Sequence, residues 1–224
     1  MTTTPLPHET LADIAVARPA ASRVFYRHGL DFCCHGGRPI AEACAERGLD
    51  PERVLAEITA EEEASDAGVR WAERPLAELV DHIVDHYHRR LREELPQLVE
   101  MAQKVERRHA EKQSCPHGLA EILSTAHHAV VDHLFKEEQI LFPMIRAGRG
   151  AHAAAPIHVM EVEHDDHAAN LRRIRTLTAD LEAPPEACAT WQALYLRLGQ
   201  LEQEEVMEHI HLENNVLFRR ALGE

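Results

Sequence analysis

The most informative stretch of this 224-residue chain is HLFKEEQILF at residues 133–142, because HIHLENNVLF at residues 209–218 repeats its pattern. Both stretches follow H-x3-E-x2-(I/V)-L-F, in which an imidazole and a carboxylate stand four residues apart. On a helix, this spacing places the two side chains on one face, about one turn apart. The apolar residues seven and eight positions after each histidine continue that face. We therefore predict that both His–Glu pairs point into a helical core.

The sequence around this repeat shows helical periodicity and little strand character. From Leu76 onward, apolar residues recur at intervals of three and four. Four helices are predicted at about 76–110, 118–147, 157–182 and 186–222, separated by helix-breaking or flexible segments. Short connections make neighbouring helices antiparallel. We predict an all-α protein with an up-down-up-down four-helix bundle over residues 75–224.

The same repeat selects one histidine on each of the other two helices. His133 and His209 are 76 residues apart, and so are His88 and His164. The last two both lie on apolar stripes of their helices. Equal offsets indicate a helical hairpin used twice, with an approximate two-fold axis through a shared site.

Other histidines fit this pattern less well. His117/Glu121 and His128/Asp132 have a similar spacing, but neither pair is followed by the I-L-F continuation. The second choices, which lie off the apolar stripe or have no histidine counterpart in the other half, are His82, His86 and His167. His128, His167 and His211 are candidates for hydrogen bonds to the site from outside it.

Buried carboxylates in a bundle core predict bound cations. An unpaired buried charge costs several kcal/mol, and two divalent ions would remove that cost for Glu137 and Glu213. A single histidine on an apolar stripe is more often an ordinary core residue, so the prediction rests on the whole set. The predicted metal ligands are His88, His133, Glu137, His164, His209 and Glu213.

The ligand types indicate which metal. Four imidazoles and two carboxylates without an inward-facing thiolate suit iron or manganese, suit zinc less well, and do not suit copper(I) or an iron–sulfur cluster. Carboxylates on facing helices can bridge two ions about 3.5–4 Å apart, with two histidines completing each one. We expect two non-haem iron ions with an oxo or hydroxo bridge.

The N-terminal part is predicted to be a separate, small helical domain over residues 1–63, joined to the bundle by a linker over 64–74. Adjacent cysteines, Cys33 and Cys34, lie in a loop flanked by Gly36 and Gly37. Their thiols are candidates for iron transfer or redox chemistry; the alternative is that they are small apolar residues buried in a helical turn. The other cysteines, which we expect to be structural, are Cys44, Cys115 and Cys188.

The overall composition excludes some classes of function. A formal charge of −14 and a pI near 5.6, without clustered Lys and Arg, argue against nucleic-acid binding. No apolar run approaches the roughly 18 residues of a membrane span, and the N-terminus lacks the features of an export signal. An odd number of cysteines fits reduced thiols. We expect a soluble protein of the cytoplasm.

Five motifs together resemble one known family. They are DFCCHGG at 31–37, YH at 87–88, HLFKEEQILFP at 133–143, VMEVEH at 159–164 and HIHLENNVLF at 209–218. The chain resembles the hemerythrin-like di-iron proteins and, over nearly its whole length, their repair of iron centres subgroup of the ScdA/YtfE type. In that family four histidines and two bridging glutamates hold the metals, and they fall on the same six residues.

The resemblance implies a function that the spacing does not. It implies repair of iron–sulfur clusters damaged by nitric oxide or peroxide, with iron supplied from the di-iron centre to damaged proteins and with Cys33 and Cys34 in the small N-terminal domain. Alternatives are reduction of nitric oxide at the metals, and sensing or storage of a diatomic gas such as nitric oxide or dioxygen. Oxygen-carrying hemerythrins use a fifth histidine, for which this repeat offers no position.

Overall fold

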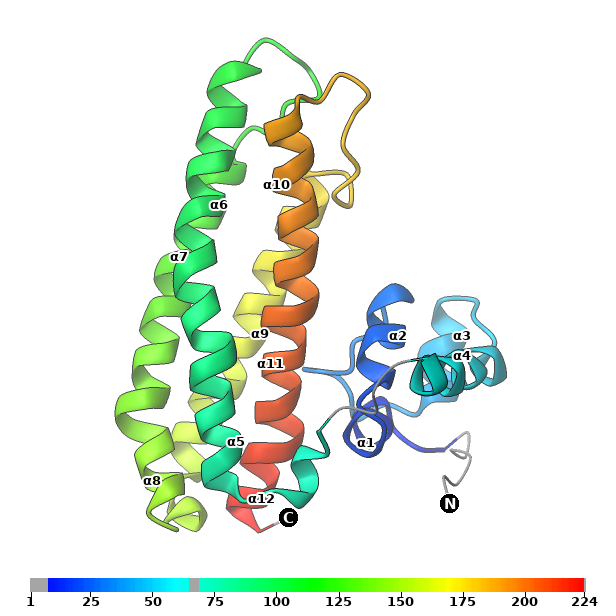
Figure 1. Ribbon diagram of the computed structural model, residues 1–224, viewed down its shortest axis with the longest axis vertical. Coiled ribbons are helices and arrows are strands. Elements are labelled where there is room, and N and C mark those ends of the chain that lie inside the picture. Colours follow the sequence, from blue (N-terminus) through cyan, green and yellow to red (C-terminus); the bar gives the residue numbers. More distant parts are fainter. Residues whose placement is uncertain (1–7, 65–68, 224) are drawn as a thin grey trace.

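The computed structural model describes residues 8–64 and 69–223, and all the regular elements within these ranges are helical. Apart from the helices, these ranges contain an isolated antiparallel bridge between Thr10 and Pro39. Figure 1 shows a long helical bundle with a smaller group of helices, α1–α4, packed beside one end of it. The predicted all-α class, with a small N-terminal unit followed by a bundle, is confirmed. No helix within the described ranges has the length and apolar character needed to cross a membrane.

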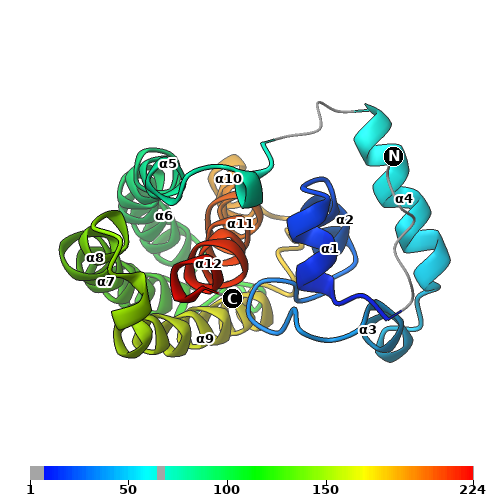
Figure 2. The same cartoon turned by 90° about the horizontal axis from the view of Figure 1, so that it is seen from below.

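Four helical rods run side by side in the bundle (Figures 1 and 2). The first rod consists of α5 (Leu76–His82), η2 (Ile83–His88) and α6 (Arg89–Arg108). The second consists of α7 (Leu119–Lys136), η3 (Glu137–Leu141) and α8 (Phe142–Arg146), and after the short turn η4 (Gly150–His152) α9 (Ala154–Leu177) forms the third. The fourth consists of α10 (Ala189–Gln200), η5 (Leu201–Met207), α11 (Glu208–His211), η6 (Leu212–Phe218) and α12 (Arg219–Leu222).

The third rod ends earlier than its apolar pattern predicts. Helix α9 stops at Leu177, whereas the sequence indicated about residue 182. Ala179, Asp180 and Leu181 all have positive φ angles, which cannot continue a right-handed helix. The Thr178 hydroxyl donates to the carbonyl of Ile174 and accepts from the amide of Leu181, which stabilises this turn.

Wide π-helical turns interrupt all rods except the third. Segment η2 ends at His88, η3 begins at Glu137, and η6 contains Glu213. Such turns add a residue to the helical repeat and are frequent at functional sites. Three of the four π segments in the described residues therefore contain a predicted ligand, and the sequence pattern alone did not predict them.

The predicted ligands separate two apolar clusters inside the bundle. One cluster packs around Leu98, Leu119 and Trp191, and the other packs around Ile83 and Leu217. Along each rod, the histidine or glutamate of the repeat stands between residues of the two clusters. A polar layer is thus enclosed by apolar packing on both sides.

The N-terminal unit has an apolar core of its own. It consists of α1 (Leu11–Ala17), α2 (Ala21–Arg27), α3 (Ile40–Glu46) and α4 (Pro51–Ala64). Its core is formed by residues such as Phe25, Ile40 and Ile58. The predicted linker, 64–74, lies partly outside the described residues; its last part forms η1 (Trp71–Glu73), whose Trp71 carbonyl accepts a hydrogen bond from Arg220.

Tyr26 attaches this unit to the bundle. Its hydroxyl donates to the carbonyl of Gly199 (3.1 Å) and accepts from Nη2 of Arg175 (3.0 Å). Burial, together with the nearby charge of Glu202, raises the pKa of Tyr26 to about 12, so the donor stays protonated.

Removing this hydroxyl is expected to weaken the attachment. In Tyr26→Phe, the carbonyl of Gly199 and the guanidinium of Arg175 each lose a partner, which lowers the free energy of unfolding by about 1–2 kcal/mol. Chemical denaturation measures the change, and Leu196→Ala, at a side chain 65% exposed on α10, the helix that contains Gly199, is the control. Equal stabilities of Tyr26→Phe and the unchanged chain would show that these bonds contribute nothing.

Candidate metal centre

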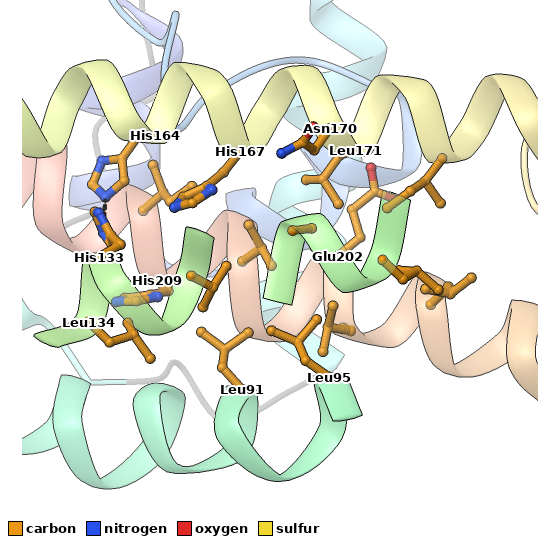
Figure 3. Close-up of a pocket in the computed structure, with 18 of the residues that line it drawn as sticks. Leu91, Leu95, His133, Leu134, His164, His167, Asn170, Leu171, Glu202 and His209 are labelled. Carbon is orange, nitrogen blue, oxygen red and sulfur yellow. Dashed lines mark hydrogen bonds between the residues drawn. The ribbon is translucent and has the colours of Figure 1, made fainter. Parts of the chain in front are cut away.

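The structure brings the six predicted ligands together in the polar layer of the bundle. Each of these residues is at most 3% exposed. One histidine comes from each rod, and one glutamate comes from each of the second and fourth rods. Figure 3 shows His133, His164 and His209 lying close to one another, with a contact drawn between His133 and His164.

Two groups of possible ligand atoms form within this layer. The 88/209 group contains His88 and His209, the 133/164 group contains His133 and His164, and both groups include Glu137 and Glu213. In each group, one ligand atom from every residue lies within 4.8 Å of the others. Two groups that share two carboxylates are consistent with a dimetal site.

The distances inside each group suit ligands of a common ion. Nε2 of His88 lies 3.1 Å from Nε2 of His209, and Nε2 of His133 lies 3.1 Å from Nε2 of His164. Two atoms about 2.1 Å from one metal ion, at roughly a right angle, are separated by about 3 Å. Pairs of imidazole nitrogens at this distance can therefore bind the same ion.

The two carboxylates lie between the groups. Oε1 of Glu213 is 2.9 Å from Nε2 of His209, while its Oε2 is 3.1 Å from Nε2 of His164. Oε2 of Glu137 is 3.4 Å from Nε2 of His88 and 3.5 Å from Nε2 of His133. Each carboxylate thus faces both histidine pairs, as a bridging ligand must.

The carboxylate of Glu137 provides a direct test of whether a cation fits. Both of its oxygens are buried, and neither has a hydrogen-bond partner among the described residues. A buried carboxylate without partners is costly, and a divalent cation on each side would supply the missing contacts. The donor set therefore fits two metal ions.

Without metal, the two carboxylates differ in their affinity for a proton. Burial and the neighbouring Glu213 raise the pKa of Glu137 well above its usual value. Burial also opposes ionisation of Glu213, but the imidazoles of His209 and His164 hold its pKa well below the usual value. Burial lowers the pKa of His133 to about 2, which keeps it in the neutral form that metals bind.

Three residues outside the six predicted ligands accept hydrogen bonds that orient three of the four histidines. Nδ1 of His88 donates to Glu138 (2.8 Å), and Nδ1 of His133 donates to Glu163 (2.9 Å). Nδ1 of His164 donates to the side-chain oxygen of Asn214 (2.8 Å). These bonds fix the tautomer in which Nε2 faces the site. Sequence reasoning missed Glu138, Glu163 and Asn214, although each directly precedes or follows a predicted ligand.

The lower-ranked histidines do not join either group. His117 and His128 are exposed, and Nδ1 of His128 donates to the carbonyl of Ser124. The rings of His82 and His86 stack on each other. His167 is buried with its ring against that of His133, and burial lowers its pKa to about 4.

The loop that carries Cys33 and Cys34 lies against the bundle beside His164. The two sulfurs are 3.7 Å apart, and Sγ of Cys34 lies 3.9 Å from the carbonyl oxygen of His164. The side-chain amide of Asn214 donates to the carbonyl of Cys33 (3.2 Å). Asp31, Cys33 and Cys34 form a third cluster of possible metal ligands, and all five cysteines are free thiols.

An apolar cavity of about 50 Å³ adjoins the metal centre (Figure 3). Its walls are formed mainly by aliphatic side chains such as Leu91 and Leu95, and His133, His164 and His209 lie at one end. His167 also lines this cavity, and its Nε2 has no hydrogen-bond partner among the described residues. The volume exceeds the roughly 10–15 Å³ that a single water needs.

Comparisons with known proteins agree with this site. The family model described as the hemerythrin HHE cation binding domain matches residues 79–221, and the ScdA_N model, a domain of unknown function (DUF542), matches residues 7–62. Proteins named iron-sulfur cluster repair protein YtfE are similar over 215 residues: 46% identical in Citrobacter koseri and in Escherichia coli, and 44% in Yersinia pseudotuberculosis. Each alignment covers 96% of this chain and 97% of the relative.

The fold and the site together define the class of protein domain. A four-helix bundle whose rods bring four histidines and two shared glutamates into one buried layer is a hemerythrin-type cation-binding domain. With the ScdA_N unit in front of it and an end-to-end match to these relatives, the chain belongs to the YtfE (ScdA) family of iron–sulfur cluster repair proteins.

Proposed function

We propose that this chain holds two iron ions and donates iron to proteins whose iron–sulfur clusters have been damaged by nitrosative or oxidative stress. The observation that carries the proposal is the pair of buried histidine–glutamate groups, sharing Glu137 and Glu213, beside a loop with two free thiols. The names of the relatives support the repair of clusters. The proposed setting is the cytoplasm, where the five thiols stay reduced.

The proposed ligands are the six side chains of the two groups. His88 and His209 would hold one iron, His133 and His164 would hold the other, and both would share Glu137 and Glu213. Imidazole and carboxylate donors without thiolate favour iron over copper(I). When bound, the irons supply exchangeable cargo and, in the ferrous state, reducing electrons.

The composition of the site favours release of iron. Each ion has two imidazoles of its own and shares both carboxylates, so solvent molecules complete its coordination. Ions held by few private ligands leave more readily than ions in a closed cage. The residues 1–63 then form the thiol-bearing domain and 75–224 the iron-holding domain.

The thiol loop is the proposed route for the iron. Cys34 is half-buried against the backbone of His164, and Cys33 is among the residues that line a cavity of about 650 Å³ between the N-terminal unit and the segments α9 and η5. Two sulfurs 3.7 Å apart match the separation of two thiolates that bind one ion at about 2.3 Å in tetrahedral geometry. Iron that leaves the centre on this side meets these sulfurs.

Replacing both thiols is expected to separate delivery from metal binding. The double variant Cys33→Ala/Cys34→Ala should keep two irons and an unchanged absorption spectrum. Its rate of iron transfer to an apo iron–sulfur protein should fall at least about tenfold, because a tenfold change corresponds to the loss of one good ligand interaction. Cys188→Ala, which removes a thiol at the start of α10, is the matched control.

The test of the proposed function uses the anaerobic protein loaded with ⁵⁷Fe and an acceptor with a nitrosylated or apo cluster. We expect the label to move into the acceptor cluster and the acceptor to regain activity. If the donor keeps all its iron while the acceptor regains no cluster, iron donation is wrong.

Reduction of nitric oxide is the second candidate. The apolar cavity beside His133, His164 and His209 has room for a diatomic gas and excludes charged molecules. Two ferrous ions would supply two electrons, so that two nitric oxide molecules and two protons give nitrous oxide and water. Single-turnover gas analysis of the reduced protein checks this, and absence of nitrous oxide on that timescale eliminates it.

A further inference from the structure

The two halves of the bundle repeat the bonds that orient the histidines of the first and third rods. Glu138 directly follows Glu137, and Asn214 directly follows Glu213. Residues 138 and 214 are 76 positions apart, as are residues 137 and 213. Glu138 accepts from Nδ1 of His88, and Asn214 accepts from Nδ1 of His164. The same arrangement therefore uses a carboxylate in one half and an amide in the other.

The two acceptors are anchored differently. Glu138 is held within the bundle, because Nη2 of Arg92 on the first rod lies 2.9 Å from its oxygen. Asn214 is held from outside, because its Nδ2 donates to the carbonyl of Cys33 in the thiol loop. A backbone carbonyl can only accept, so Nδ2 must face Cys33 and the amide oxygen is left for His164. A carboxylate at residue 214 could not make both bonds.

We propose that Asn214 is a positioning residue that couples the thiol loop to one metal position, the one formed by His133 and His164. The loop fixes the orientation of the amide, and the amide fixes the tautomer and direction of His164. When the loop moves away, the amide is free to rotate and His164 loses its fixed orientation. The 88/209 position keeps its support from Glu138 and Arg92.

Because of this coupling, the two irons would leave the protein at different rates. This part of the inference rests on the proposed function. The iron held by the 133/164 group leaves first, on the side where Cys34 lies against the backbone of His164. Contact between the thiol loop and an acceptor protein would displace the loop. The act of docking would thereby release iron from the neighbouring position.

Two adjacent glycines provide a means to move the loop without changing the bundle. A Cβ atom at Gly36 would lie 2.3 Å from the carbonyl oxygen of Phe32 and 2.9 Å from Cβ of Ala12, so the loop must shift. A Cβ atom at Gly37 would meet nothing within 4 Å. Gly36→Ala therefore displaces the loop, and Gly37→Ala is its matched control.

The experiment measures anaerobic iron release to a ferrous chelator from five fully loaded proteins: the unchanged chain, Gly36→Ala, its control Gly37→Ala, Asn214→Asp and the double variant Gly36→Ala/Asn214→Asp. In Gly36→Ala, we expect one of the two irons to leave about ten times faster. A factor of about ten is the lower end of the range seen when a metal ligand loses the group that orients it. The carboxylate introduced by Asn214→Asp has two equivalent oxygens, so it supports His164 without the loop. Asn214→Asp and the double variant should therefore release iron at rates within about twofold of each other, well inside that tenfold effect.

The outcomes separate coupling from a general structural effect. Mössbauer spectra should change for one iron in Gly36→Ala and for neither in Gly37→Ala. Unchanged release in Gly36→Ala, or equal acceleration with asparagine and aspartate at residue 214, would overturn the proposal. Because the chelator replaces the acceptor protein, failure of cluster repair would leave this result intact, and failure here would leave repair intact.

Discussion

Replacing Glu213 by glutamine is expected to abolish stable binding of both metal ions. Glu213 is the residue whose two oxygens face the two histidine pairs, at 2.9 Å from His209 and 3.1 Å from His164. Removing one partner of a buried charge pair costs about 3–5 kcal/mol, which weakens binding roughly 10²–10⁴-fold. Metal analysis after gel filtration and titration with ferrous iron would measure the loss.

A substitution outside the centre provides the control for this result. Glu121 stands four residues after His117, the same spacing as in the repeat, but both side chains are exposed at the start of the second rod. Glu121→Gln should keep both ions. Retention of two ions by Glu213→Gln would contradict a shared bridging role, and loss of only one ion would assign Glu213 to a single position.

Removing the metal ions is expected to lower the melting temperature strongly. A ligand present at about a thousand times its dissociation constant stabilises the folded state by about 4 kcal/mol. For a chain of this size, that corresponds to roughly 8–16 °C. Calorimetry of the loaded protein and of the protein stripped by a chelator compares the two states under the same buffer and protein concentration.

Glu137→Gln separates the metal contribution from the packing of the side chain. Burial and the neighbouring Glu213 raise the pKa of Glu137 well above its usual value, which favours the protonated carboxyl in the metal-free protein, and glutamine has a similar shape without the charge. The metal-free variant should melt within about 2 °C of the metal-free unchanged chain, which corresponds to a change of less than about 1 kcal/mol in the free energy of unfolding. Added iron should no longer raise its melting temperature. A large fall in the metal-free variant would mean that ionised Glu137 stabilises the fold by itself.

Much of the fold could be predicted because the apolar period extends over each rod. The helix ranges follow from that period and from the Gly- and Pro-containing breaks between them. The end of α9 could not be predicted, because the left-handed turn formed by Ala179, Asp180 and Leu181 contains no glycine to mark it. The π turns were also missed, because their extra residue leaves the local composition unchanged.

The six residues of the centre could be selected from the sequence because a repeat constrains them jointly. A four-residue spacing alone also selects His128 and Asp132, which lie exposed on α7. The 76-residue offset and the apolar continuation distinguish the two cases. Their assignment as iron ligands remains a prediction, as do the roles of Cys33 and Cys34.

The residues that orient the ligands could not be selected in the same way. Glu163 and Glu138 are two of many acidic residues, and their bonds to His133 and His88 depend on which rods lie side by side. The bond between Asn214 and Cys33 joins residues 181 positions apart. Contacts of this kind follow from tertiary packing and leave no periodic pattern in the sequence.

The internal repeat has a consequence for how the two metal positions can differ. If two identical hairpins associated as separate chains, symmetry would force every substitution to occur on both sides of the axis. Joining the hairpins in one polypeptide removes that restriction, so residues 138 and 214 can be a glutamate and an asparagine. A single chain can therefore keep one ion firmly held while it makes the other responsive to a neighbouring domain.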